Sequence, residues 1–189
     1  RRIRRIIPSL LIVIIFSYPF FFFTLIPLDL SNYSISIFYT LGFLSNFHFH
    51  YSGIEYGGIS SLLKPFLHTW SLAIEEQFYI IFPFFILFTI KFLKKHLLII
   101  LFIACLVSLS FAEVSSKTHP SFNFYILFSR GWELLIGSIL AYIVLYKNHL
   151  SKSVPKNLKE FLVLFSLLII LGSFFIFDNN TSHPSLITL

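Results

Sequence analysis

Long apolar runs separated by short polar segments dominate the sequence. A helix needs roughly 20 apolar residues to cross the hydrocarbon core of a bilayer, and five runs reach or approach that length. They are residues 6–27, 66–90, 97–112, 125–146 and 161–177. The pattern predicts an all-α fold, a polytopic transmembrane helical bundle with about five spanning helices.

The segment 34–47 is also apolar, and its assignment decides the topology. If it crossed the bilayer, the cluster of Lys91, Lys94 and Lys95 would lie outside, whereas basic residues are retained in cytoplasmic loops. We therefore predict that residues 34–47 form an interfacial or re-entrant helix on the outer side. Residues 48–64 would then be an external loop.

Three basic clusters set the orientation of the five spans. They precede the first run, follow the second, and separate the fourth from the fifth: Arg1, Arg2, Arg4 and Arg5; Lys91, Lys94 and Lys95; Lys147, Lys152, Lys156 and Lys159. With these clusters in the cytoplasm, the five spans alternate in direction without conflict. We expect a multi-pass protein of the inner (plasma) membrane, with the N-terminal end of this chain in the cytoplasm.

Composition supports the lipid bilayer as the surroundings of the chain. Hydrophobic residues make up 57% and charged residues 12%, and the mean hydropathy is +0.86, whereas a water-soluble domain needs more charge to cover its surface. The net charge of +6 does not indicate nucleic acid as a partner, because the basic residues lie in clusters between apolar runs. The single cysteine, Cys105, excludes an internal disulfide.

Ionisable residues inside two of the predicted spans are candidates for chemistry, because each costs about 2.5–3.5 kcal/mol to insert. The second span contains His68, Glu75 and Glu76. On a helix, His68 and Glu75 lie two turns apart on nearly one face, with Ser71 and Tyr79 one turn to either side of Glu75. The side chains of Glu75 and Glu76 point about 100° apart, so we expect them to have different partners.

The fourth span carries Arg130 and Glu133 at i, i+3 spacing. Both ionisable groups fall at or just inside the outer ends of helices that run from outside to inside. Arg130 could therefore compensate Glu75 or Glu76 across a helix interface. A structural interpretation stays open beside the catalytic one, in which a buried ion pair only holds two helices together.

The arginines at the start of the chain, Arg1, Arg2 and Arg5, also have two interpretations. They can be a topogenic cluster that keeps this end inside, or an anion site, because guanidinium groups bind phosphate bidentately. No metal site is expected, since His48 and His50 have no Cys or carboxylate at ligand spacing.

Three motifs give the chain a resemblance to a known family. Residues 68–79 read HTWSLAIEEQFY, which resembles the signature of the acyltransferase 3 family of membrane O-acyltransferases, O-antigen acetylases included. Residues 1–8 match the RRxxRIxP pattern of that family, and residues 130–137 match its R-x-W-E-L-L-x-G element. Ser45-Asn46 also fits, and the motifs occur in the family's order.

The resemblance implies an enzyme that moves an acyl group, usually acetyl, from cytoplasmic acyl-CoA to a hydroxyl of an envelope glycan such as O-antigen, exopolysaccharide or peptidoglycan. Residues 1–189 would be part of a single transmembrane acyltransferase domain, incomplete at both ends. The family's catalytic His lies in an earlier span and has no counterpart here, so we expect this stretch alone to be inactive. Candidate residues for catalysis are Glu75, Glu76, His68, Arg130 and Glu133, and Arg1, Arg2 and Arg5 are candidates for binding acyl-CoA.

Two other classes of protein fit the same pattern of residues. In a transporter or flippase-like protein, the intramembrane Glu, His and Arg would form a proton or substrate path. In a structural membrane subunit they would only pack helices. Acyl-CoA-dependent labelling of envelope glycan distinguishes the enzyme from both.

Overall fold

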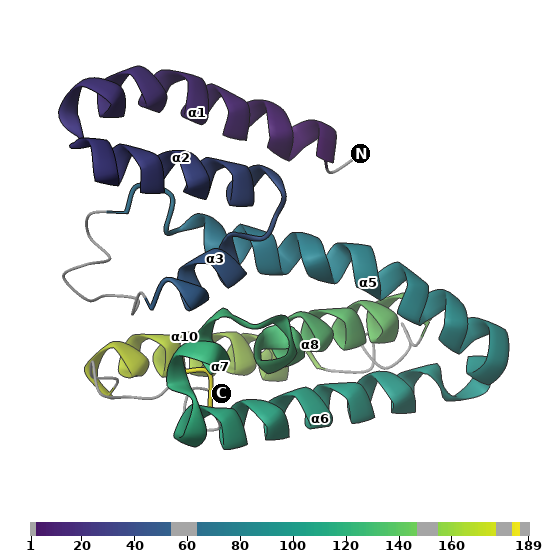
Figure 1. The fold of residues 1–189 in the computed structure, drawn as a ribbon. Helices are drawn as coiled ribbons and strands as arrows, with labels where there is room; N and C mark the ends of the chain where they lie inside the picture. The colour runs from purple at the N-terminus through teal and green to yellow at the C-terminus, as the bar shows by residue number, and fades with distance from the viewer. Residues whose placement is uncertain (1–2, 54–63, 147–154, 177–182, 186–189) are drawn as a thin grey trace. The chain divides into compact units, whose positions relative to one another are not determined.

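The structure, a computed structural model, describes residues 3–53, 64–146, 155–176 and 183–185. Within these ranges every regular element is a helix (Figure 1), and the all-α prediction is confirmed. In chain order the helices are α1 (Ile3–Thr24), α2 (Pro27–Leu41), α3 (Ser45–Tyr51), α5 (Thr69–Leu93), the 3-10 turn η1 (Lys94–His96), α6 (Leu97–Thr118), α7 (Pro120–Tyr125), α8 (Leu127–Tyr146) and α10 (Lys156–Ile176).

Each of the five predicted apolar runs overlaps one long helix: α1, α5, α6, α8 or α10. In the described part of the chain, three helical stretches are long and apolar enough to cross a membrane: Arg4–Thr24, Thr69–Thr118 and Pro120–Tyr146. The second stretch is 50 residues long and contains both α5 and α6. The α-helical conformation is interrupted there at Lys94–His96, where three consecutive basic side chains form the η1 turn.

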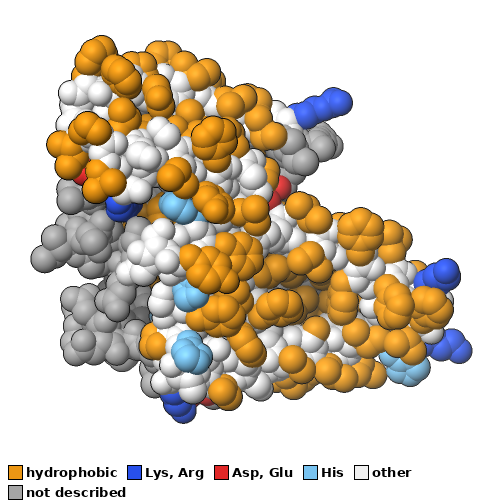
Figure 2. All heavy atoms as spheres, viewed as in Figure 1, with side chains coloured by type: hydrophobic (Ala, Val, Ile, Leu, Met, Phe, Trp, Pro, Cys, Tyr) orange, Lys and Arg blue, Asp and Glu red, His pale blue; other side chains and the backbone are white. Residues whose placement is uncertain are grey.

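The surface of these helices is largely apolar. Exposed side chains include Phe16 at 77%, Phe23 at 85% and Val114 at 65% relative exposure. Figure 2 shows hydrophobic side chains over most of the visible face, with Lys and Arg confined to a few positions at its margins. Apolar area on this scale is unfavourable in water and favourable against acyl chains, so the chain is a membrane protein.

The chain divides into two compact units, which we describe separately. The first comprises Arg1–Pro83 with Tyr125–Leu127, and the second comprises Phe84–Phe124 with Phe128–Leu189. In the first unit, α1 and α2 pack through Tyr33, whose exposure is 3%. The Tyr33 ring lies 4.9 Å from Phe21 and 5.5 Å from Phe66, and its hydroxyl is 2.9 Å from the Ser17 hydroxyl.

The segment predicted as one interfacial or re-entrant helix, residues 34–47, consists of the end of α2, a turn and the start of α3. The Leu44 amide donates to the Tyr39 carbonyl at 2.8 Å, and Phe43 takes a positive φ of 53°. This left-handed residue ends α2 and redirects the chain. The helix α3 extends to Tyr51, into the predicted external loop, and residues 54–63 of that loop lie outside the described residues. The position of this segment relative to the membrane stays a prediction.

In the second unit, α6 and α8 approach closely where both carry small residues. A Cβ added to Gly131 would lie 3.2 Å from the Ser108 hydroxyl oxygen. That hydroxyl donates to the Phe128 carbonyl at 2.6 Å and accepts from the Trp132 amide at 2.9 Å. Small residues that allow close backbone approach, with a hydroxyl bridging the helices, are typical of packing in membranes.

Candidate functional site

Residues 69–79 of the motif form the first turns of α5, directly after His68, and two polar residues of the motif anchor the helix within the first unit. Thr69 donates its hydroxyl to the Phe66 carbonyl at 2.7 Å and lies 3.1 Å from the Thr40 hydroxyl. The Ser45 hydroxyl donates to the Thr69 carbonyl at 2.9 Å. Thr69, Thr40 and Ser45 are all buried, so this start of α5 is tied to both α2 and α3.

A second anchor is an amide pair between Gln77 of α5 and Asn46 of α3. The Gln77 amide donates to the Asn46 side-chain oxygen and to the Phe43 carbonyl, both at 2.9 Å. The Asn46 amide donates to the Tyr125 carbonyl at 3.0 Å, and Asn46 is fully buried. The sequence drew attention to Ser45-Asn46 only through the family resemblance. Their structural role, holding the turn after α2 against α5, was not predicted.

The two carboxylates of the motif lie in different surroundings. His68, Ser71 and Tyr79 are exposed and Glu75 is half-buried, which places them on one accessible face of α5. Glu76 is 4% exposed. The accessible face is the polar stripe that helical spacing predicts, so a substrate can reach Glu75 more readily than Glu76. Their roles in catalysis stay predictions.

Arg130 is held at the start of α8 by contacts within the second unit. Its Nε donates to the Phe124 carbonyl at 3.0 Å, and its guanidinium lies 4.7 Å from the centre of the Phe124 ring. The distance from Nη1 to the Glu133 carboxylate is 3.5 Å, and the Arg130 and Glu133 side chains are 12% and 36% exposed. At that distance the pair is a loose ion pair, and the carbonyl and the ring do more to position the guanidinium.

The catalytic residues predicted on α5 and α8 belong to different units. His68, Glu75 and Glu76 are in the first unit, and Arg130 and Glu133 are in the second. The pairing of Arg130 with Glu75 or Glu76 therefore stays a prediction. Of the arginines predicted to bind the donor, Arg5 is exposed near the start of α1, and Arg1 and Arg2 lie outside the described residues. Among the described residues, no three His, Cys, Asp or Glu side chains come together as a possible metal site.

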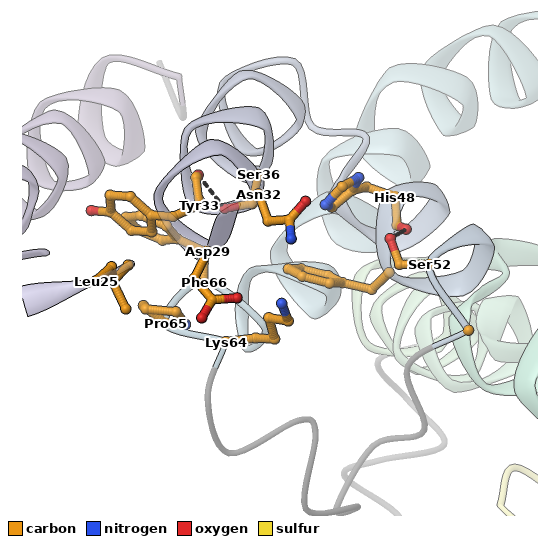
Figure 3. A pocket seen from close by; sticks show the side chains of 12 residues that line it. Leu25, Asp29, Asn32, Tyr33, Ser36, His48, Ser52, Lys64, Pro65 and Phe66 are labelled. Atoms are coloured by element: carbon orange, nitrogen blue, oxygen red, sulfur yellow. Dashed lines mark hydrogen bonds between the residues drawn. The ribbon is translucent and has the colours of Figure 1, made fainter. Parts of the chain in front are cut away.

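The first unit also contains a cavity of about 410 Å³ that the sequence did not predict. It is lined from α2, α3 and the segment before α5, and its polar lining includes Asp29, Asn32, His48 and Lys64. Figure 3 shows the Asn32, His48 and Lys64 side chains directed toward a common space. Burial lowers the pKa of His48, and the Lys64 ammonium lowers it further, so the imidazole is neutral and can accept a proton or a hydrogen bond.

These features define an α-helical membrane protein with buried polar contacts near the starts of α5 and α8. A family model described as an acyltransferase domain matches residues 1–189. The chain belongs to this family, the acyltransferase 3 family, as the motifs predicted.

Curated relatives agree with this assignment. Peptidoglycan O-acetyltransferase OatA of Listeria monocytogenes is 34% identical over 168 residues, which is 86% of this chain and 26% of that protein. O-acetyltransferase OatA of Staphylococcus aureus is 32% identical, over 91% of this chain and 30% of that protein. An uncharacterized protein of Haemophilus influenzae is 32% identical, over 100% of this chain and 79% of that protein. The chain thus spans under a third of the two OatA proteins, and no solved structure matches it.

Proposed function

We propose that residues 1–189 are part of a single membrane-embedded domain that transfers an acetyl group from acetyl-CoA to a hydroxyl of an envelope glycan. One observation carries the proposal: the acyltransferase family model matches both compact units, across all 189 residues. Among the glycans considered, peptidoglycan is the acceptor we favour, because a relative covering 86% of this chain is named a peptidoglycan O-acetyltransferase.

The proposed reaction forms an ester bond and breaks a thioester bond. The glycan hydroxyl loses its proton to a base, its oxygen forms the new C–O bond to the acetyl carbon, and the C–S bond breaks. The leaving thiolate takes up the proton. A carboxylate within reach of the hydroxyl can serve as the base, and a fixed cation can stabilise the oxyanion.

The accessibility of the two carboxylates supports Glu75 for the role of base or orienting group. It lies on the accessible face of α5, whereas Glu76 is 4% exposed. Arg130 would supply the cation, because the Phe124 carbonyl and ring hold its guanidinium in place without neutralising its charge. A preorganised charge needs no reorientation as the transition state forms.

The arginines at the start of α1 would bind the phosphates of the donor. Arg5 is exposed, and planar guanidinium groups bind phosphate through two parallel hydrogen bonds. Retention of basic clusters in the cytoplasm would place these arginines where acyl-CoA is found. The phosphates of the donor would then bind toward the cytoplasmic face of the inner membrane, and its acetyl group would pass, directly or by a relay, to the acceptor toward the outer face.

The test is expression of the complete gene product in a host whose peptidoglycan lacks O-acetyl groups. Base-labile acetate released from purified peptidoglycan should appear with the wild type and be absent with Glu75→Gln at equal membrane abundance. Ser71→Ala, one turn from Glu75 on the same face, is the matched control and should retain activity. If the wild type adds no acetate to any envelope glycan while it is folded in the membrane, the proposed activity is wrong.

A further inference from the structure

The cavity in the first unit contains polar side chains that the fold itself leaves unused. Across the described ranges, no hydrogen bond or ion pair engages the side chains of Asp29, Asn32 or Lys64. Asn32 is exposed, and Asp29 and Lys64 are half-buried. Polar groups that converge on a cavity without structural partners are available to orient a ligand.

The charge of the lining identifies the kind of ligand. Asp29 and Lys64 carry opposite charges, and His48 is held neutral by burial and by Lys64. Among the described residues of the lining, the charges therefore balance. A phosphate-bearing ligand such as CoA would favour an excess of cations, whereas a neutral ligand with several hydroxyls fits a balanced set of donors and acceptors.

The remaining walls of the cavity are partly aromatic and partly aliphatic, and they include the half-buried Leu25 and Pro65. Phe49 and Phe66 line it and are 1% and 2% exposed, and Tyr33 lies against Phe66 with ring centres 5.5 Å apart. Sugar rings combine an apolar C–H face with hydroxyls at their edge, so an apolar wall with polar groups around it is complementary to such a ring. The volume of about 410 Å³ is within the range of small-ligand sites.

The cavity also lies at the appropriate end of α1. Arg4 and Arg5 are at the start of this 22-residue helix, and Leu25, which lines the cavity, follows its last residue. At 1.5 Å per residue, the helix separates the two ends by roughly 33 Å, about the thickness of the hydrocarbon core. With the arginines in the cytoplasm, the cavity lies toward the outer face, where envelope glycan is located.

We propose that this cavity, lined by Asp29, Asn32, His48, Lys64, Phe49 and Phe66, binds one uncharged sugar unit of the acceptor glycan. The proposal rests on the acetyltransferase function above and assigns its acceptor subsite. Asn32, Asp29 and Lys64 hydrogen-bond the hydroxyls of the sugar, and its C–H face packs against Leu25 and Pro65. The ligand is a neutral sugar rather than the phosphates of the donor.

Binding is measured on the purified complete gene product in lipid nanodiscs, by calorimetry with the N-acetylglucosamine disaccharide and separately with CoA. Asn32→Ala and Lys64→Gln should each weaken disaccharide binding about fivefold to tenfold, the effect of losing one hydrogen bond to the ligand. CoA binding should be unchanged. Two variants serve as matched controls. Ser31→Ala is the control for Asn32→Ala on α2, and His50→Gln is the control for His48→Gln on α3. Neither Ser31 nor His50 lines the cavity, so both control variants should bind as the wild type does.

Kinetics of acetyl transfer separate this inference from the proposed function. Asn32→Ala should raise the KM for the disaccharide about fivefold to tenfold with little change in kcat. If the wild type transfers acetyl while Asn32→Ala and Lys64→Gln bind and use the disaccharide normally, the acceptor subsite is elsewhere and the proposed function stands. Loss of CoA binding in these variants would also overturn the inference, because it would make the cavity a donor site. A folded wild type that binds the disaccharide but transfers no acetyl would overturn the proposed function instead.

Discussion

Replacement of Gly131 by Ala tests the close packing of α6 against α8. The new methyl would lie 3.2 Å from the Ser108 hydroxyl oxygen, closer than an ordinary van der Waals contact. Ser108 cannot move away freely, because it donates to the Phe128 carbonyl at 2.6 Å and accepts from the Trp132 amide at 2.9 Å. Overpacking of this kind typically costs about 1–3 kcal/mol.

Gly137 provides the matched control on the same helix, because a Cβ there would meet nothing within 4 Å. Both substitutions gain the same helix propensity, about 0.5–1 kcal/mol, so that term cancels in the comparison. The difference in unfolding free energy between Gly137→Ala and Gly131→Ala should therefore equal the cost of overpacking. At about 2–4 °C per kcal/mol for a chain of this size, the melting temperatures should differ by several degrees.

The assay is thermal unfolding of the purified complete gene product in nanodiscs. Removal of the Ser108 hydroxyl supplies an internal check, because Gly131→Ala should be less damaging in a Ser108→Ala background than alone. Equal melting temperatures for Gly131→Ala and Gly137→Ala would refute the close approach of the two helices at this position.

Three further predictions concern the charged groups. Glu75→Gln should abolish glycan acetylation in a stable protein. Glu76→Gln should mainly lower the melting temperature, because Glu76 is 4% exposed and its buried contacts would be left imperfectly paired. The reverse pattern would exchange their roles. Arg1, Arg2 and Arg5 can be replaced together by Lys, which keeps the charge but lacks the planar guanidinium that binds phosphate bidentately. The affinity of this triple variant for acetyl-CoA should fall, while its insertion into the membrane stays normal. Burial lowers the pKa of His48 in the folded protein. As the pH falls below about 6.5, the imidazole is therefore protonated in the unfolded chain before it is protonated in the folded protein. The free energy of unfolding falls until the pH passes the pKa of the folded state. A pH series of melting temperatures should show a smaller loss in His48→Gln, and an identical loss would contradict this account.

The long helices could be predicted because apolar runs of spanning length leave few alternatives. Each run had to satisfy its backbone hydrogen bonds internally in lipid, which a helix achieves with local sequence alone. The division of residues 34–47 into two helices was missed because Phe43, an aromatic residue, takes the left-handed conformation more typical of Gly. Nothing in the periodicity of that segment marks the turn.

Contacts between distant residues account for the rest of what the sequence did not predict. Asn46 and Gln77 are 31 positions apart, and the cavity combines Asp29, His48 and Lys64 from three separate segments. Helical periodicity identifies which residues share a face of one helix, but it cannot identify which helices pack together. The polar face of α5 was therefore predictable, whereas the polar cavity beside α2 and α3 was not.

Acetyl transfer across a membrane tests the central claim most directly. The complete gene product is reconstituted into proteoliposomes in one orientation, with isotope-labelled acetyl-CoA on the side of the N-terminal arginines and a soluble peptidoglycan fragment on the other side. The account predicts labelled O-acetyl ester on the fragment, lost with Glu75→Gln and retained with Ser71→Ala. Absence of labelled ester from a folded wild type, or its formation only when donor and fragment share a side, would contradict the account.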